Sequence, residues 1–172
     1  MAIFYKNFRR GFINSAPLLL LYFLSITELD TEFSNYFEIL SFNLQLIVIY
    51  YWYLKIPSIL GNVHIFTAGI INDIIMGLPK GISSLGYLTT ALVAIYVRNV
   101  TLKMTLFTDW FTFVLAIFFS NLTYLILINN FSEINIHYSN LFYNSLFTFL
   151  FFPVFWFLFN SYQFITNLGK DD

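Results

Sequence analysis

The sequence predicts an all-α integral membrane protein, a bundle of six transmembrane helices with both termini on the cytoplasmic side. The composition, six apolar segments and the placement of the basic residues predict it. Hydrophobic residues make up 59% of the 172 residues and charged residues 10%, whereas a soluble domain is about 25% charged. The mean hydropathy is +0.74. Because so few charges cannot cover a water-facing surface, we expect residues 1–172 to form a single integral membrane domain.

Six apolar segments approach the length of about 20 residues that a helix needs to cross the hydrocarbon core. What remains is enough for tails and short connections only, so we expect no domain outside the membrane. The helices are expected over about residues 12–29, 39–56, 59–78, 82–100, 106–128 and 141–164.

The first segment follows a basic tail but lacks a small-x-small cleavage site, so we expect a retained helix and not a signal peptide. The second and third segments are separated by Lys55-Ile56-Pro57-Ser58, and the third and fourth by Leu78-Pro79-Lys80-Gly81. Proline and glycine end helices, and such short links make the flanking helices antiparallel neighbours. In the last segment, Pro153 predicts a kink.

The basic residues fix the orientation, because cytoplasmic loops are enriched in Lys and Arg. With the N-terminus inside, the outer loops carry one basic residue, Lys80, together with most of the acids. The remaining basic residues fall on the cytoplasmic side: Lys6, Arg9, Arg10, Lys55, Arg98, Lys103 and Lys170.

Asp73 is the clearest anomaly, because a carboxylate at membrane depth is costly unless it is paired, hydrated or protonated. Gly69 and Gly77 lie four residues on either side of Asp73, so the three positions share one helix face. Small residues at that spacing let another backbone approach closely. We therefore expect Asp73 to face protein and to bind N–H groups or hydroxyls of a neighbouring helix. Two interpretations are open: a site for coupling or partner recognition, and a buried structural carboxylate that locks the third and fourth helices or opens a small hydrated cavity.

The fourth segment offers a matching stripe of small residues, Ser83, Gly86, Thr90 and Ala94, at i, i+3, i+7 and i+11. We expect this stripe to pack on Gly69 and Gly77.

Other polar residues point to structure more than to chemistry. Asp109 lies in the first turn of the fifth segment, where the helix dipole favours an acid. The amides Asn43, Gln45 and Asn121 are expected to join helices. His64 lies nine residues from Asp73 and on the opposite face of the helix, so the two cannot share a metal directly.

Several function classes are excluded by what the sequence lacks. It has no cysteine and a net charge of −1, so it offers neither thiolate chemistry nor a basic surface for nucleic acid. It has no cluster at zinc spacing, no nucleophile elbow and no glycine-rich phosphate loop; the other histidine, His137, is expected in an outer loop. We therefore expect no enzyme activity and no cofactor.

Two motifs resemble the rod shape-determining MreD family. That family has a YW-x-L-x-x-P-like end of its second span, here Tyr51 to Pro57. It then has a G-x-x-x-D-x-x-x-G-x-x-x-G run through the third span and its exit, here Gly69, Asp73, Gly77 and Gly81. The length, the basic N-terminal tail and an aromatic last helix with Trp156 also fit.

The resemblance implies a non-catalytic multi-pass component of the bacterial inner membrane. It would belong to the cell-elongation machinery that organises lateral peptidoglycan synthesis and rod shape. Implied partners are the bitopic MreC-like protein, the actin-like MreB, a RodA-type glycosyltransferase and its penicillin-binding protein. The implied fold is similar to that of the substrate-binding components of energy-coupling-factor transporters.

Two alternatives stay open. The chain could be such a substrate-binding component for a vitamin, although its first helix lacks the Ala-x-x-x-Ala-like docking motif and reads Ser15-Ala16-Pro17-Leu18. It could also be an unrelated polytopic protein in which the Asp73 motif arose by chance.

Overall fold

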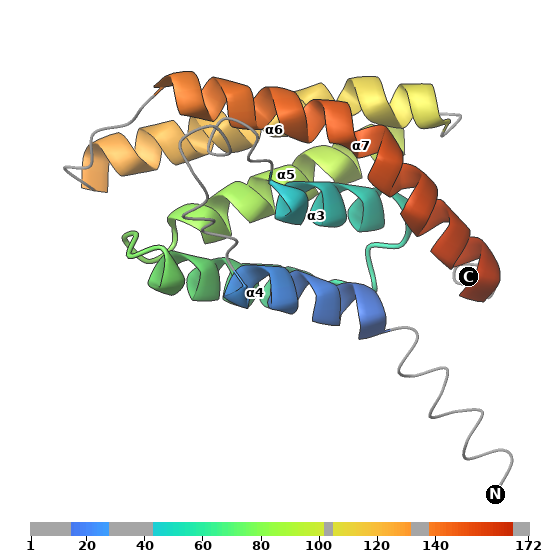
Figure 1. Cartoon of the computed structure of the whole chain (residues 1–172), viewed down its shortest axis with the longest axis horizontal. Coiled ribbons are helices and arrows are strands. Elements are labelled where there is room, and N and C mark those ends of the chain that lie inside the picture. The colour runs from blue at the N-terminus through green and yellow to red at the C-terminus, as the bar shows by residue number, and fades with distance from the viewer. Residues whose placement is uncertain (1–14, 28–42, 102–104, 132–137, 167–172) are drawn as a thin grey trace, which may run out of the picture.

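The structure, a computed structural model, describes residues 15–27, 43–101, 105–131 and 138–166. These residues form six α-helices (Figure 1). The first, Ser15–Ile26, has no label in the figure and is drawn in blue. The others are α3 Leu44–Lys55, α4 Asn62–Ile75, α5 Ile82–Val100, α6 Leu106–Phe131 and α7 Tyr138–Thr166. The all-α prediction is therefore confirmed for the described residues.

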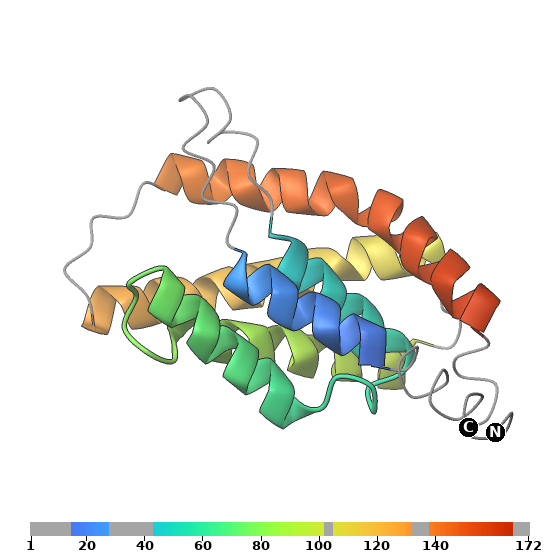
Figure 2. The same cartoon turned by 60° about the horizontal axis from the view of Figure 1, so that its bottom comes forward.

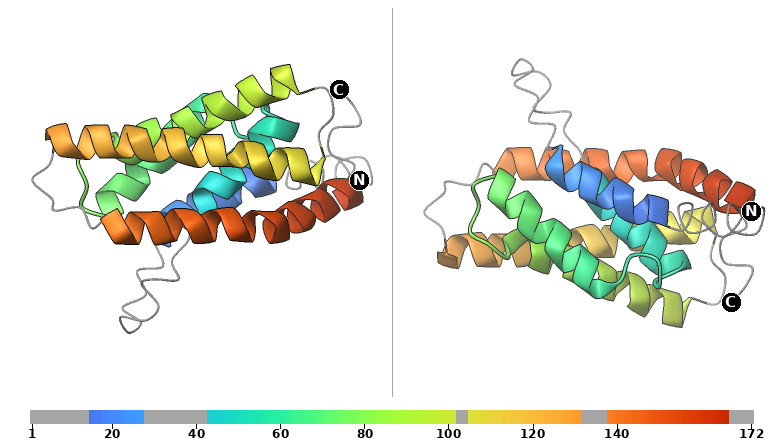
Figure 3. Two further views of the ribbon diagram at one scale, coloured as in Figure 1. Left: turned by 90° about the horizontal axis from the view of Figure 1, so that it is seen from above. Right: turned by 90° about the horizontal axis from the view of Figure 1, so that it is seen from below.

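The six helices form an antiparallel bundle, in which consecutive helices point in opposite directions (Figures 1 and 2). The start of the first helix and the end of α7 lie at the same end of the bundle (Figure 2). The α4–α5 turn lies at the opposite end, and α5 packs against α3, α4 and α6 (Figure 3).

The short helix α3 is the centre of the bundle. Every residue from Leu46 to Leu54 is buried. A helix that is apolar on all sides must be enclosed by other helices, and α3 is in contact with α5, α6 and α7. Asn43 starts it, because its side-chain oxygen accepts a hydrogen bond from the N–H of Leu46 at 3.1 Å.

Helix α4 is shorter than the expected segment 59–78, for two local reasons. At its start, Ile56 to Gly61 form turns, with the N–H of Gly61 donating to the carbonyl of Pro57, and Gly61 has φ +65°. At its end, Gly77 adopts φ +64°, which a helix cannot continue through.

The first helix and α3 are also shorter, within the described residues, than the expected segments 12–29 and 39–56. The last three helices begin and end close to the expected positions. Helix α5 has the expected bounds, α6 continues three residues further, and α7 is longer at both ends. The basic residues on which the orientation depends are described only in part. The following lie outside the described residues: Lys6, Arg9, Arg10, Lys103, Lys170 and the outer-loop acids Glu28, Asp30, Glu32, Glu38 and Glu133.

Among the described helices, α6 and α7 are long and apolar enough to cross a membrane, judged by length and composition alone. The first helix is apolar but shorter. At 1.5 Å per residue, α3 and α4 span about 18 and 21 Å, which is less than the hydrocarbon core of about 30 Å.

Candidate functional site

Asp73, in the last turn of α4, caps the start of the neighbouring helix α5. Its side chain is fully buried. One carboxylate oxygen accepts a hydrogen bond from the N–H of Gly81 at 2.6 Å, and the other accepts from the N–H of Ser83 at 2.8 Å. The first N–H groups of a helix have no partner within the helix, and the helix dipole favours a negative charge there. The Asp73 carboxylate supplies both the acceptors and the negative charge at the start of α5, although it belongs to the preceding helix.

The turn between α4 and α5 depends on two glycines with positive φ. Gly77 ends α4 in a Schellman arrangement, in which Leu78 N–H donates to Asp73 C=O at 2.8 Å and Gly77 N–H to Ile74 C=O at 3.4 Å. Gly81 has φ +107° immediately before α5. Side chains are strained in this conformation, so glycine at both positions lets the chain turn back within six residues.

At Gly69, α4 lies against the backbone of α5. A Cβ at Gly69 would lie 2.5 Å from Ser84 N and still closer to Ser84 Cα. The Ser84 hydroxyl also donates to the carbonyl of Phe66 at 2.9 Å. Gly69, Asp73, Gly77 and Gly81 therefore act together to close one helical hairpin.

The expected packing of the small-residue stripe differs from the structure in two ways. Gly69 lies against Ser84, which is next to the stripe residue Ser83, whereas a Cβ added at Gly77 would meet no atom within 4 Å beyond its chain neighbours. Gly77 is also beyond the end of α4, so it does not share a helix face with Asp73. Within the stripe, Gly86 faces Ser120 of α6, while Thr90 and Ala94 are buried. The stripe therefore contacts two helices: Ser83 bonds to Asp73 and Asn72 of α4, and Gly86 contacts α6.

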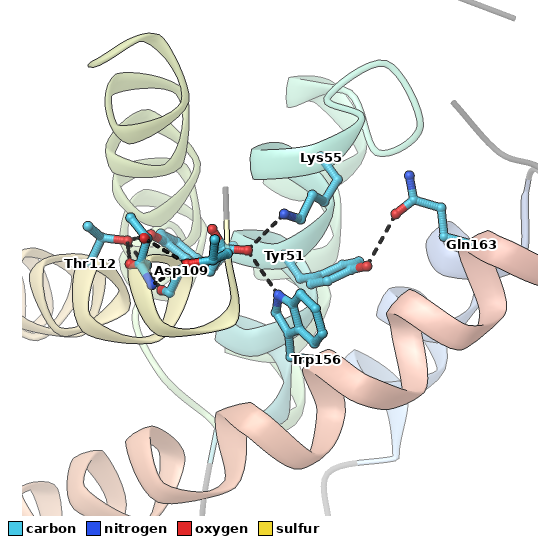
Figure 4. Close-up of polar contacts among 9 residues, drawn as sticks. Tyr51, Lys55, Asp109, Thr112, Trp156 and Gln163 are labelled. Atoms are coloured by element: carbon cyan, nitrogen blue, oxygen red, sulfur yellow. Dashed lines mark hydrogen bonds and ion pairs between the residues drawn. The ribbon is translucent and has the colours of Figure 1, made fainter. Parts of the chain in front are cut away.

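A buried ion pair at the opposite end of the bundle joins three helices (Figure 4). Lys55 Nζ, at the end of α3, lies 2.8 Å from Asp109 Oδ2 in the first turn of α6. The same oxygen accepts a hydrogen bond from Trp156 Nε1 of α7 at 2.9 Å, and Lys55 Nζ lies 5.8 Å from the centre of the Trp156 ring. Asp109 is 1% exposed and Lys55 14%, so both charges are held largely away from solvent.

Pro153 lies inside α7, three residues before Trp156 of this cluster. Proline has no N–H, so the carbonyl of Phe149, four residues earlier, has no donor within the helix. Trp110 Nε1 of α6 donates to that carbonyl at 2.9 Å, and its ring stacks on Phe149 with 5.1 Å between centroids. The consecutive residues Asp109 and Trp110 therefore hold α7 on both sides of its proline.

The sequence interpretation missed this cluster. Lys55 was expected on the cytoplasmic side, Asp109 was given a local role as a helix-start acid, and Trp156 was named only as part of an aromatic last helix. The sequence did contain one indication of this cluster. In the predicted topology, the end of the second segment and the start of the fifth both lie at the cytoplasmic side of the membrane. The rotation of each helix, which decides whether the side chains meet, was not predictable from spacing.

The predicted helix-joining amides bond across helices at two places. Gln45 Nε2 donates to the carbonyl of Leu24 at 3.1 Å and to Asn72 Oδ1 at 3.4 Å. Asn121 Nδ2 of α6 donates to Ser145 Oγ of α7 at 2.6 Å.

The histidines give no sign of metal binding. His64 shares a hydrogen bond with Tyr22 at 3.1 Å, and His137 lies outside the described residues. Among the described residues, no group of three His, Cys, Asp or Glu could hold a metal ion.

Comparison of the chain with protein-family models, with curated proteins and with solved structures found no match.

Proposed function

We propose that this chain is a non-catalytic component of a bacterial cell-elongation complex, a multi-pass protein of the inner membrane that recognises its partners through helix faces. The observation that carries the proposal is the α4–α5 hairpin. The motif that resembles the MreD family, Gly69-Asp73-Gly77-Gly81, accounts for that hairpin residue by residue: a close approach, a cap and two turns with positive φ.

The hairpin also supplies a surface for such recognition. An apolar groove of about 430 Å³ lies between α4 and α5, and its walls include Val63, Phe66, Leu88 and Leu92. Ala91, which is 2% exposed, also lines it, and small residues allow close approach of a partner helix in a membrane. We propose that the single span of an MreC-like protein binds in this groove, with the actin-like MreB, a RodA-type glycosyltransferase and a penicillin-binding protein joining the same complex.

Co-purification from native membranes in mild detergent, with partners identified by mass spectrometry, tests the proposal. We expect the MreC-like protein and the cell-wall synthases. Recovery of paired ATPases with a coupling membrane subunit would contradict the proposal and favour the vitamin transporter instead.

Two variants test the groove. Leu92→Trp fills the groove at a residue that is 66% exposed, so we expect normal protein levels and loss of the MreC-like partner. Phe118→Trp is the matched control, because Phe118 is 59% exposed on α6, away from the groove. If the MreC-like partner is recovered equally with both variants, the groove is not its binding site.

Asp73→Ala tests the hairpin itself. It removes both caps of α5, and we expect a lower protein level or weaker assembly. A normal protein level together with normal cell shape would show that the motif has no role in the complex.

A further inference from the structure

A second cavity, of about 200 Å³, lies at the end of the bundle that holds the α4–α5 turn. Residues of α4, α5, α6 and α7, together with the start of α3, line it. Its polar lining is unusual for the interior of so apolar a chain, because it contains four carboxamides and several hydroxyls. The lining residues that matter most are Asn43, Asn72, Ser83, Ser120, Asn121 and Asn144.

Two of these carboxamides have hydrogen-bonding capacity to spare among the described residues. Asn43 uses its oxygen to accept from the N–H of Leu46, which leaves its NH₂ group as a donor. Asn121 uses its NH₂ group to donate to Ser145, which leaves its oxygen as an acceptor. Among the described side chains, Trp52 Nε1 is the one fully enclosed polar atom that lacks a hydrogen-bond partner. The spare NH₂ group of Asn43 and the spare oxygen of Asn121 are therefore not fully enclosed.

No charged side chain of the described residues lines the cavity. Asp73 is close in sequence to the lining residue Asn72, but both of its oxygens are occupied by the N–H groups of Gly81 and Ser83. Among the described residues, a charged ligand would find no opposite charge to offset the hydration that it loses, and that loss is costly. A neutral ligand that carries both donors and acceptors would match the carboxamides.

We propose that this cavity binds a small neutral polyhydroxylated molecule of the monosaccharide class. Its volume corresponds to roughly six or seven water molecules at about 30 Å³ each, which is close to what one sugar ring with its hydroxyls displaces. Sugar hydroxyls both donate and accept, so one can accept from the spare NH₂ group of Asn43 and another can donate to the spare oxygen of Asn121. The rings of Tyr87 and Tyr124 complete the wall. The proposal does not depend on the function proposed above.

The absence of cysteine from the chain gives a direct test. Leu46 lines the cavity and is 5% exposed, so Leu46→Cys in the full chain, reconstituted in nanodiscs, places one thiol in the site. A small uncharged maleimide measures its reactivity, and Asn130→Cys, at an exposed residue near the end of α6, is the control. The probes are glucose and N-acetylglucosamine as neutral sugars, and glucosamine and glucuronate as charged sugars of similar shape.

We expect at least one neutral sugar to protect Leu46→Cys, at a concentration at least tenfold lower than either charged sugar, and no sugar to protect Asn130→Cys. A thiol that does not react would show a closed cavity, and a reactive thiol that no neutral sugar protects would show a cavity that holds water only. Equal protection by charged and neutral sugars would show that the lining does not distinguish neutral from charged ligands. Each of these three results overturns the proposal.

A second variant measures the role of the carboxamide without relying on Leu46→Cys. Asn121→Leu removes the acceptor, and we expect the heat of neutral-sugar binding to the purified protein to disappear in calorimetry. Asn130→Leu is the matched control, since Asn130 is exposed on the same helix and bonds to its own backbone at Ile126. If Asn121→Leu binds as the control does, or if neither the natural sequence nor the control binds, the proposal fails.

Discussion

At the scale of single residues, Gly69 is the position that tolerates change least. A methyl group there would overlap the backbone of Ser84, and backbone atoms cannot rotate away as a side chain can. We expect Gly69→Ala to lower the free energy of unfolding by about 1–3 kcal/mol, as overpacking of a tight core does. Reversible unfolding in mixed micelles measures the change.

Gly86→Ala is the control for this prediction. The added methyl would lie 3.3 Å from Ser120 Oγ, a side-chain atom, which can move by a rotation about χ1. We expect a smaller loss of stability than for Gly69→Ala. Equal losses would show that the α4–α5 crossing is no tighter than the α5–α6 contact.

At the scale of helices, α7 bends along its length, as expected from Pro153 (Figure 1), and α6 donates a hydrogen bond to the carbonyl that the proline leaves without a donor. Trp110→Phe keeps the ring that stacks on Phe149 and removes the N–H that serves its carbonyl. We expect a loss of about 1–3 kcal/mol in the free energy of unfolding, the cost of an unsatisfied buried carbonyl. In a Pro153→Ala background, residue 153 supplies the missing N–H, so the same substitution should cost less. A double-mutant cycle with these two changes measures the coupling, and independent effects would contradict the assignment.

The ion pair beside this kink couples three helices. Lys55→Met leaves Asp109 without its cation, and Asp109→Asn leaves Lys55 without its anion while still offering an acceptor to Trp156. We expect each single change to lower the free energy of unfolding by about 3–5 kcal/mol, because it strands a buried charge. The double variant holds no uncompensated charge and should lose much less than the sum. Additive losses in reversible unfolding would show that the pair is not coupled.

The sequence predicted contacts within a helical hairpin better than contacts between distant helices. The carboxylate of Asp73 was expected to meet N–H groups of a neighbour, and the short turn after α4 keeps the start of α5 close to Asp73. The role of Gly77 was predicted wrongly, since its spacing suggested a helix face whereas its positive φ ends the helix. The Lys55–Asp109–Trp156 cluster joins residues far apart in the chain, and only the packing of α3, α6 and α7 brings them together.

At the scale of the whole molecule, the two ends of α5 carry the residues that test how the bundle lies in a membrane. Lys80 in the α4–α5 turn and Arg98 near the end of α5 are both exposed, and the helix between Ile82 and Arg98 rises by about 24 Å at 1.5 Å per residue. With the orientation that the basic residues predict, Lys80 is outside and Arg98 is cytoplasmic.

Single cysteines at these two positions measure the orientation, because the chain has no cysteine of its own. In intact cells a membrane-impermeant maleimide should label Lys80→Cys, and it should label Arg98→Cys only after the membrane is permeabilised. Labelling at Arg98→Cys alone in intact cells would invert the orientation. Labelling at both positions, or at neither until permeabilisation, would place the two ends of α5 on one side of the membrane. Either of these last results would contradict the six-span topology, since α5 could then not cross it.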